Sequence, residues 1–212
     1  YATMKYLLLI TISSAILTGC QAHSTPEATL QQRFEALNAQ LKETVDDHGP
    51  RAALDSLTAI ANTDTDIAGL CHGLAHEIGH ESWEHLGFTG ALAIQDDICG
   101  SGYIHGIIER ELGEHVQDVE TTYKTLCPAN DARCFHGLGH GLMFATDNNV
   151  PRSIALCKAL PIAFQRVQCD EGVFMENFEA DTTLHPSQYL YPDDPYKTCR
   201  DESPIEKGVC TF

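Results

Sequence analysis

The chain has 212 residues, 43% of them hydrophobic, and a formal net charge of -17 at pH 7. This length suits a single domain with enough apolar content to bury a core. Such a negative charge repels nucleic acid and anionic lipid headgroups, so we exclude a nucleic-acid-binding role; it attracts cations without selecting among them.

The N-terminal segment has the composition of an export signal. A short basic stretch at residues 4–6 precedes an apolar run at residues 7–17 that is too short to span a membrane as a mature helix. The run ends in Leu17-Thr18-Gly19-Cys20, which resembles the lipobox of bacterial lipoproteins. The resemblance implies that residues 1–20 are a signal peptide, cleaved before Cys20. It further implies that the Cys20 thiol is lipidated and anchors the chain to the cell envelope, at an outer membrane facing the periplasm or at a cell surface.

The remainder divides into a tether at residues 21–26, a helical domain at 27–180 and a tail at 181–212 rich in proline and tyrosine. The first helix is predicted to begin at Thr25-Pro26, with threonine as its cap, and to end near His48-Gly49. Further helices are predicted at residues 50–62, 66–85, 89–97, 101–112, 116–126, 135–146, 151–160 and 171–179. The tail is predicted as an extended aromatic loop. Because no strand-like alternation of useful length appears, the predicted fold class is all-α.

Three cysteines recur at intervals of 35 residues, at Cys99, Cys134 and Cys169. A glycine follows each of them three positions later, and His-Gly follows in the first two copies, at residues 105–106 and 140–141. An interval near 35 residues is typical of helix-turn-helix solenoids. We therefore predict an α-solenoid-like array of antiparallel helical hairpins. In its interval and helix pairing alone, this plan loosely resembles tetratricopeptide and Sel1-type repeats.

Glycines at matched positions indicate that helices approach one another closely. Gly102 and Gly106 are four residues apart, as are Gly137 and Gly141, so each pair lies on one side of its helix. An interior helical glycine costs roughly 1 kcal/mol relative to alanine. Its repetition therefore predicts a compensating close contact.

Without Cys20 the chain has eight cysteines, an even number that predicts four disulfides in an exported protein. From their order we expect three pairs: Cys127 with Cys134, Cys157 with Cys169, and Cys199 with Cys210. Cys71 and Cys99 remain as the fourth. The absence of CxxC disfavours a zinc ribbon, and the absence of CxxCH disfavours covalent haem.

Five histidines occupy repeat-equivalent positions: His72, His76, His105, His136 and His140. His72 and His76 are four residues apart, as are His136 and His140, so each pair points the same way from a helix. Imidazoles at this spacing bind Zn, Cu, Ni or Fe. We expect them to meet in one pocket that holds a divalent transition metal, zinc first, with copper or iron as alternatives. In the competing interpretation, each ring bonds a backbone carbonyl of the neighbouring hairpin and has only a structural role.

Residues 76–80 read His-Glu-Ile-Gly-His, which resembles the HExxH motif of zinc proteases of the zincin family. The resemblance implies that His76 and His80 bind zinc and that Glu77 is the general base. The metzincin extension is absent, because Trp83 and Leu86 stand where glycine and histidine are required. The third ligand would come from one of several candidates: His72, Glu84, His105, His136 or His140.

The favoured hypothesis is an exported, lipid-anchored, disulfide-stapled helical array that binds a transition metal for storage or delivery. Binding fits better than catalysis, because no complete catalytic set is visible. The first alternative is a zinc hydrolase that uses Glu77. The second is an interaction scaffold without metal, whose concave face binds a protein or a glycan and whose histidines are only structural.

Overall fold

The structure, a computed structural model, describes residues 28–94, 96–115, 126–128, 130–179, 187–191, 193–194, 196–200 and 210. Every regular element in this part of the chain is a helix, which confirms the all-α prediction. The helices are α1 (Leu30–His48), α2 (Pro50–Ala61), α3 (Thr65–Leu92), α4 (Ile98–Glu114), α6 (Ala132–Ala145), α7 (Val150–Lys158), α8 (Ala163–Glu179) and α9 (Lys197–Arg200).

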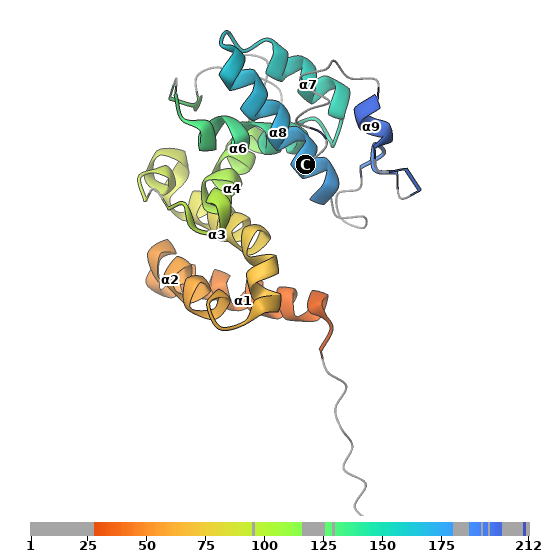
Figure 1. Cartoon of the computed structure of the whole chain (residues 1–212). Helices are drawn as coiled ribbons and strands as arrows, with labels where there is room; N and C mark the ends of the chain where they lie inside the picture. Colours follow the sequence, from red (N-terminus) through yellow and green to blue (C-terminus); the bar gives the residue numbers. More distant parts are fainter. Residues whose placement is uncertain are drawn as a thin grey trace, which may run out of the picture.

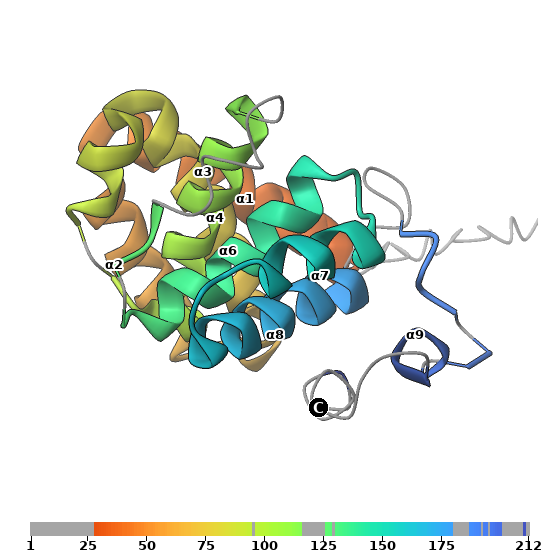
Figure 2. The ribbon, with the colours of Figure 1, turned by 90° about the horizontal axis from the view of Figure 1, so that it is seen from above.

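Successive helices pack on one another along the molecule. Helix α1 packs on α2 and α3, α3 on α4, α4 on α6, and α6 on α8, with α7 beside α8. Figure 1 places α1 and α2 at one end and α7 and α8 at the other, and Figure 2 gives the view from above. Helices α3, α4 and α6 therefore occupy the middle. Among the described helices, none combines the length and the apolar character needed to cross a membrane.

The first helix begins later than predicted. Thr29, and not Thr25, is its cap, and Thr29 exchanges reciprocal hydrogen bonds with Gln32 in a capping box. Thr25 and Pro26 lie outside the described residues, as does Cys20 with the rest of the export signal. The helix ends at His48, as expected, because Gly49 adopts a left-handed φ of 83° before the next helix starts at Pro50.

Several predicted boundaries differ from those of the structure, and one short helix was missed. Helix α3 turns at Gly87, whose φ is 65°, but resumes and ends at Leu92, so the helix predicted at 89–97 is its short continuation. Helix α4 is continuous from Ile98, but Cys99, Gly100 and Ser101 have φ values of 53°, 67° and 68°, so its regular part follows Ser101, beside the predicted start at residue 101. Helix α8 starts at Ala163 instead of 171, since residues 163–170 contain no glycine or proline to interrupt it. The tail contains the short helix α9 where a loop was predicted. An ion pair between Arg200 and Asp194 and the disulfide of Cys199 fix this helix in place.

Almost all of the helix predicted at 116–126 lies outside the described residues.

All four predicted disulfides are confirmed. Their Cα atoms are 5.5–5.7 Å apart, within the range that a disulfide bridges. The pairs are Cys71–Cys99, Cys127–Cys134, Cys157–Cys169 and Cys199–Cys210. Disulfides persist in oxidising compartments, so the chain has the chemistry of an exported protein.

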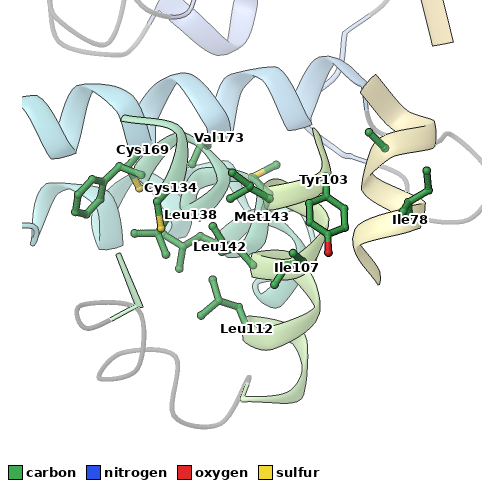
Figure 3. Packing of buried hydrophobic residues seen from close by; sticks show 14 of the residues in the cluster. Ile78, Tyr103, Ile107, Leu112, Cys134, Leu138, Leu142, Met143, Cys169 and Val173 are labelled. Carbon is green, nitrogen blue, oxygen red and sulfur yellow. The ribbon is translucent and has the colours of Figure 1, made fainter. Parts of the chain in front are cut away.

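A continuous apolar core fixes the central helices relative to one another. Tyr103 and Ile107 on α4, Leu138 on α6 and Val173 on α8 are fully buried, and Figure 3 shows them packed together between the helices. Full burial of one such aliphatic side chain contributes about 1.5–3 kcal/mol. The core thereby sets the positions of the histidines that the same helices carry.

Candidate metal centre

The five repeat-equivalent histidines come together in one group, which we call the histidine cluster. Helix α3 carries His72 and His76, α4 carries His105, and α6 carries His136 and His140. Neighbouring rings have centroids 4.6–5.9 Å apart. The spacing of four residues on α3 and on α6 therefore aims two pairs of imidazoles at the single imidazole of the helix between them.

Glycines bring these helices close enough for the rings to meet. A Cβ atom on Gly106 of α4 would lie 2.1 Å from the carbonyl oxygen of His76 on α3. A Cβ atom on Gly102 would lie 2.5 Å from the carbonyl oxygen of His72. Any larger residue would push α4 away from α3. The close approach predicted from the glycine spacing is therefore confirmed at this helix pair.

Three rings of the cluster contact oxygen atoms through Nδ1. The Nδ1 atom of His72 lies 2.6 Å from the carbonyl oxygen of Cys99. The Nδ1 atom of His76 lies 2.8 Å from Glu109 Oε1, and that of His140 lies 2.8 Å from Glu176 Oε2. The contacts of His72 and His140 are hydrogen bonds, so in the neutral tautomer with its proton on Nδ1 each ring donates to its oxygen and keeps a lone pair on Nε2. This is the arrangement in which proteins present an imidazole to a metal ion.

The Nε2 atoms of His72 and His76 lie 3.0 Å apart. At this distance either one Nε2 carries a proton and donates it to the other, or an ion that both lone pairs bind lies beside them. A zinc ion binds imidazole nitrogens at about 2.0–2.1 Å, so two nitrogens at this separation can reach one ion.

His105 lies at the centre of the cluster and is 2% exposed. Neither of its ring nitrogens has a hydrogen-bond partner among the residues that the structure describes. Burial, and then the neighbouring imidazoles, lower the pKa of His105 well below its usual range. The same causes lower the pKa of His136 to about 3. These rings are therefore neutral at pH 7, the state that binds a metal ion.

Three sets of side chains in the cluster each offer three donor atoms within 4.8 Å of one another. The first set is His72, His76 and His105, the second is His105, His136 and His140, and the third is His76, Glu109 and His140. The structure therefore brings together five of the six histidines predicted as metal ligands. In a further set, Asp46, Glu81 and His85, both carboxylates already lie at ion-pair distance from His85 Nε2.

A cavity of about 290 Å³ opens beside the cluster. Its walls include three of the histidines together with residues of α4, α6 and α8: His72, Gly100, His105, Ala132, Arg133, His136, Gln168 and Met175. The Sδ atom of Met175 lies 3.4 Å from His136 Nε2. The cavity gives a small ion a route to the buried imidazoles.

The HExxH residues divide between two sides of α3. His76 and His80 both contact the Glu109 carboxylate, at 2.8 and 2.7 Å. Glu77 lies on the side of α1, where its Oε2 is 3.0 Å from Lys42 Nζ and 3.2 Å from Asn38 Nδ2. Burial raises the pKa of Glu77, but its charged and hydrogen-bonding neighbours lower it more, so the net shift is downward. His80 belongs to none of the three-donor sets found among the described residues.

Glu109 is a residue of the site that the sequence analysis missed. It is 4% exposed, and burial raises the pKa of its carboxyl, but His76 and His80 lower it well below the usual range. The signal that would have found it is spacing, because Glu109 follows His105 by four residues and so shares its side of α4.

Comparison of the chain with protein-family models, curated proteins and solved structures finds no match.

Proposed function

We propose that this protein binds a divalent transition metal ion through the imidazoles of the histidine cluster. The proposal depends on the state of the His105 ring. This ring is buried, has no hydrogen-bond partner among the described residues, and is surrounded by four other imidazoles. A buried polar group left unpaired costs about 1–3 kcal/mol. A metal ion coordinated by His105 removes that cost.

The competing interpretation, in which the histidines have only a structural role, explains fewer of the contacts in the cluster. A ladder of histidines bonded to backbone carbonyls accounts for His72, whose Nδ1 contacts the carbonyl of Cys99. It does not account for His105, whose nitrogens face no carbonyl among the described residues. The geometry of the cluster therefore supports a ligand.

Zinc is the ion that we favour, with copper and iron as alternatives. All three accept neutral imidazole, and zinc adopts four-coordinate sites made of nitrogen and carboxylate ligands. Binding, storage or delivery fits better than hydrolysis, because Glu77 is held by Lys42 and Asn38 on the side of α1. A general base must reach the water that it activates.

We also infer that the protein is exported and held to the cell envelope by a lipid on Cys20, and that its 35-residue interval builds a hairpin array whose concave face is open to a protein partner. Four disulfides support the export. Incorporation of a labelled fatty acid into the wild-type chain, and its loss in Cys20→Ser, tests the anchor.

The direct experiment is metal analysis of protein purified without chelator. We expect a stoichiometric transition metal in the wild-type protein and its loss in His105→Ala. His115→Ala is the matched control, because His115 is exposed at the end of the same helix and its imidazole is paired with Glu111, outside the cluster. Circular dichroism of each variant shows whether it is folded. Equal metal content in folded His105→Ala and in the control contradicts the proposal.

Glu77→Gln separates binding from hydrolysis. We expect this variant to retain the metal, because Glu77 belongs to none of the three-donor sets of the described residues. Peptidase activity in the wild-type protein that disappears in Glu77→Gln would replace our proposal with the hydrolase alternative.

A further inference from the structure

His105 belongs to two donor sets at once. It completes one set with His72 and His76 from α3 and another with His136 and His140 from α6. Its ring centroid lies 5.3 and 5.5 Å from those of the α3 pair and 5.1 and 5.0 Å from those of the α6 pair. The ring on the middle helix is therefore equally close to both pairs.

An imidazole has two nitrogens on opposite edges of its ring, and a single metal ion uses one of them. Both nitrogens of His105 lack a hydrogen-bond partner among the described residues, at a position that is 2% exposed. One ion would satisfy one nitrogen and leave the other buried and unpaired, at a cost of about 1–3 kcal/mol.

We propose that the histidine cluster holds two transition metal ions bridged by the imidazole ring of His105. One ion is bound by His105 with His72 and His76, and the other by His105 with His136 and His140. This inference rests on the proposed function and adds to it the number of ions and the role of the central ring.

An imidazole bridge between two ions requires His105 to lose one proton. Neutral His105 offers a lone pair on one nitrogen and carries a proton on the other. The second nitrogen binds an ion only when its proton passes to solvent, which leaves an imidazolate with a lone pair on each side and one negative charge. No electron is transferred, and the proton released balances the charge that the ring gains.

Two neighbouring carboxylates supply further negative charge, which with the imidazolate offsets three of the four positive charges of two dications. The carboxylate of Glu109 is 4% exposed and lies 2.8 Å from His76 Nδ1 and 3.9 Å from His140 Nδ1, so it borders both halves of the cluster. The carboxylate of Glu176 lies 2.8 Å from His140 Nδ1. Buried charges require such partners.

A metal ion has access to both histidine pairs of the cluster. The cavity beside the cluster is lined by His72 from the first set, by His136 from the second and by His105, which they share. An ion that enters the cavity therefore meets a ligand of either set.

The competing arrangement is a single ion. The rings of His72, His76, His105 and His140 all lie within 4.6–5.9 Å of one another, centroid to centroid, and would surround one ion, leaving His136 beside Met175. The number of metal ions bound per chain distinguishes the two arrangements.

The experiment uses the whole protein, stripped of metal with a chelator and reloaded with Zn²⁺ or Cu²⁺. Native mass spectrometry of the zinc-loaded protein is expected to give two ions per chain. The double variants His72→Ala/His76→Ala and His136→Ala/His140→Ala are each expected to give one, and His115→Ala two. In the copper-loaded protein, an imidazolate bridge couples the two spins antiferromagnetically, so most of the electron paramagnetic resonance signal of two Cu²⁺ ions is expected to be lost.

Each other outcome overturns the inference in a recognisable way. One ion per wild-type chain rejects the second ion and leaves the proposed function standing, whereas no ion rejects both. Two copper ions with the full signal of isolated spins reject the bridge. If circular dichroism shows that a double variant is unfolded, the stoichiometry and the spin intensity of the wild-type protein still decide.

Discussion

Among single residues, Glu109 has the greatest influence on the histidine cluster without being one of its rings. Its Oε2 accepts a hydrogen bond from His80 Nε2 at 2.7 Å, and its Oε1 lies at ion-pair distance, 2.8 Å, from His76 Nδ1. A carboxylate in this position fixes the tautomer and the orientation of an imidazole and makes its other nitrogen a stronger ligand. Glu109 therefore prepares His76 to bind a metal ion, whether or not the carboxylate binds the ion itself.

Glu109→Gln tests this role. An amide presents one acceptor oxygen and one donor nitrogen, so it can no longer place a negatively charged oxygen beside each of the two rings. We expect metal affinity to fall about 10- to 100-fold, measured by competition with a chromophoric chelator. Glu114→Gln is the control, since Glu114 is an exposed residue of the same helix that pairs with Arg110. Equal metal affinities in the two variants would show that Glu109 does not prepare His76 for metal binding.

At the scale of secondary structure elements, two helix pairs share the same kind of contact. Gly79 of α3 faces Gly106 of α4, and Gly139 of α6 faces Gly172 of α8, with added Cβ atoms 2.0–2.3 Å from carbonyl oxygens of the opposite helix. In both pairs the backbones touch without a side chain between them. The recurrence of glycine in the sequence thus corresponds to a recurrent way of joining two helices.

Gly106→Ala is expected to destabilise the fold, because its new methyl group would lie 2.1 Å from the carbonyl oxygen of His76. Overpacking of this kind costs about 1–3 kcal/mol. Gly69→Ala is the matched control on a helix: nothing lies within 4 Å of its added Cβ, so we expect a gain of up to roughly 1 kcal/mol from helix propensity. Urea unfolding of both variants measures the difference, and equal midpoints would contradict the close contact.

Helical spacing made much of the site predictable from the sequence, and helix packing explains the remainder. Residues four apart share a face, so the pairs on α3 and α6 followed from the sequence alone. The direction of Glu77 did not, because it depends on which side of α3 meets Lys42 of α1. Glu109 was missed for the same reason: a carboxylate four residues after His105 becomes informative only once α4 is known to lie between the two histidine pairs.

At the scale of the whole molecule, the disulfides hold different parts of the site in place. Cys71–Cys99 ties α3 to the start of α4, and the carbonyl of Cys99 accepts from His72 Nδ1. Cys157–Cys169 ties α7 to α8. The order of the cysteines along the chain was enough to predict these pairs, because each connects helices that follow one another.

Removing one disulfide at a time distinguishes an effect on the stability of the fold from an effect on metal affinity. Loss of a native disulfide costs about 2–5 kcal/mol, so both Cys71→Ser/Cys99→Ser and Cys157→Ser/Cys169→Ser are expected to unfold at lower denaturant concentrations. Only the first is expected to lower metal affinity as well, since it frees the carbonyl that orients His72. Isothermal titration calorimetry with Zn²⁺, on variants shown to be folded, measures this. Equal affinity losses in both would indicate a general loosening of the fold.

The glycine contacts between helices also bear on which ions fit. No side chain stands between α3 and α4 at Gly106 that could shorten, rotate or be compressed, so the gap between these helices is set by the size of backbone atoms. The Cα atoms that carry the imidazoles of α3 and α4 are therefore held at a fixed separation. We expect ionic radius to become a criterion of selection, with a small first-row cation bound more tightly than the larger Cd²⁺.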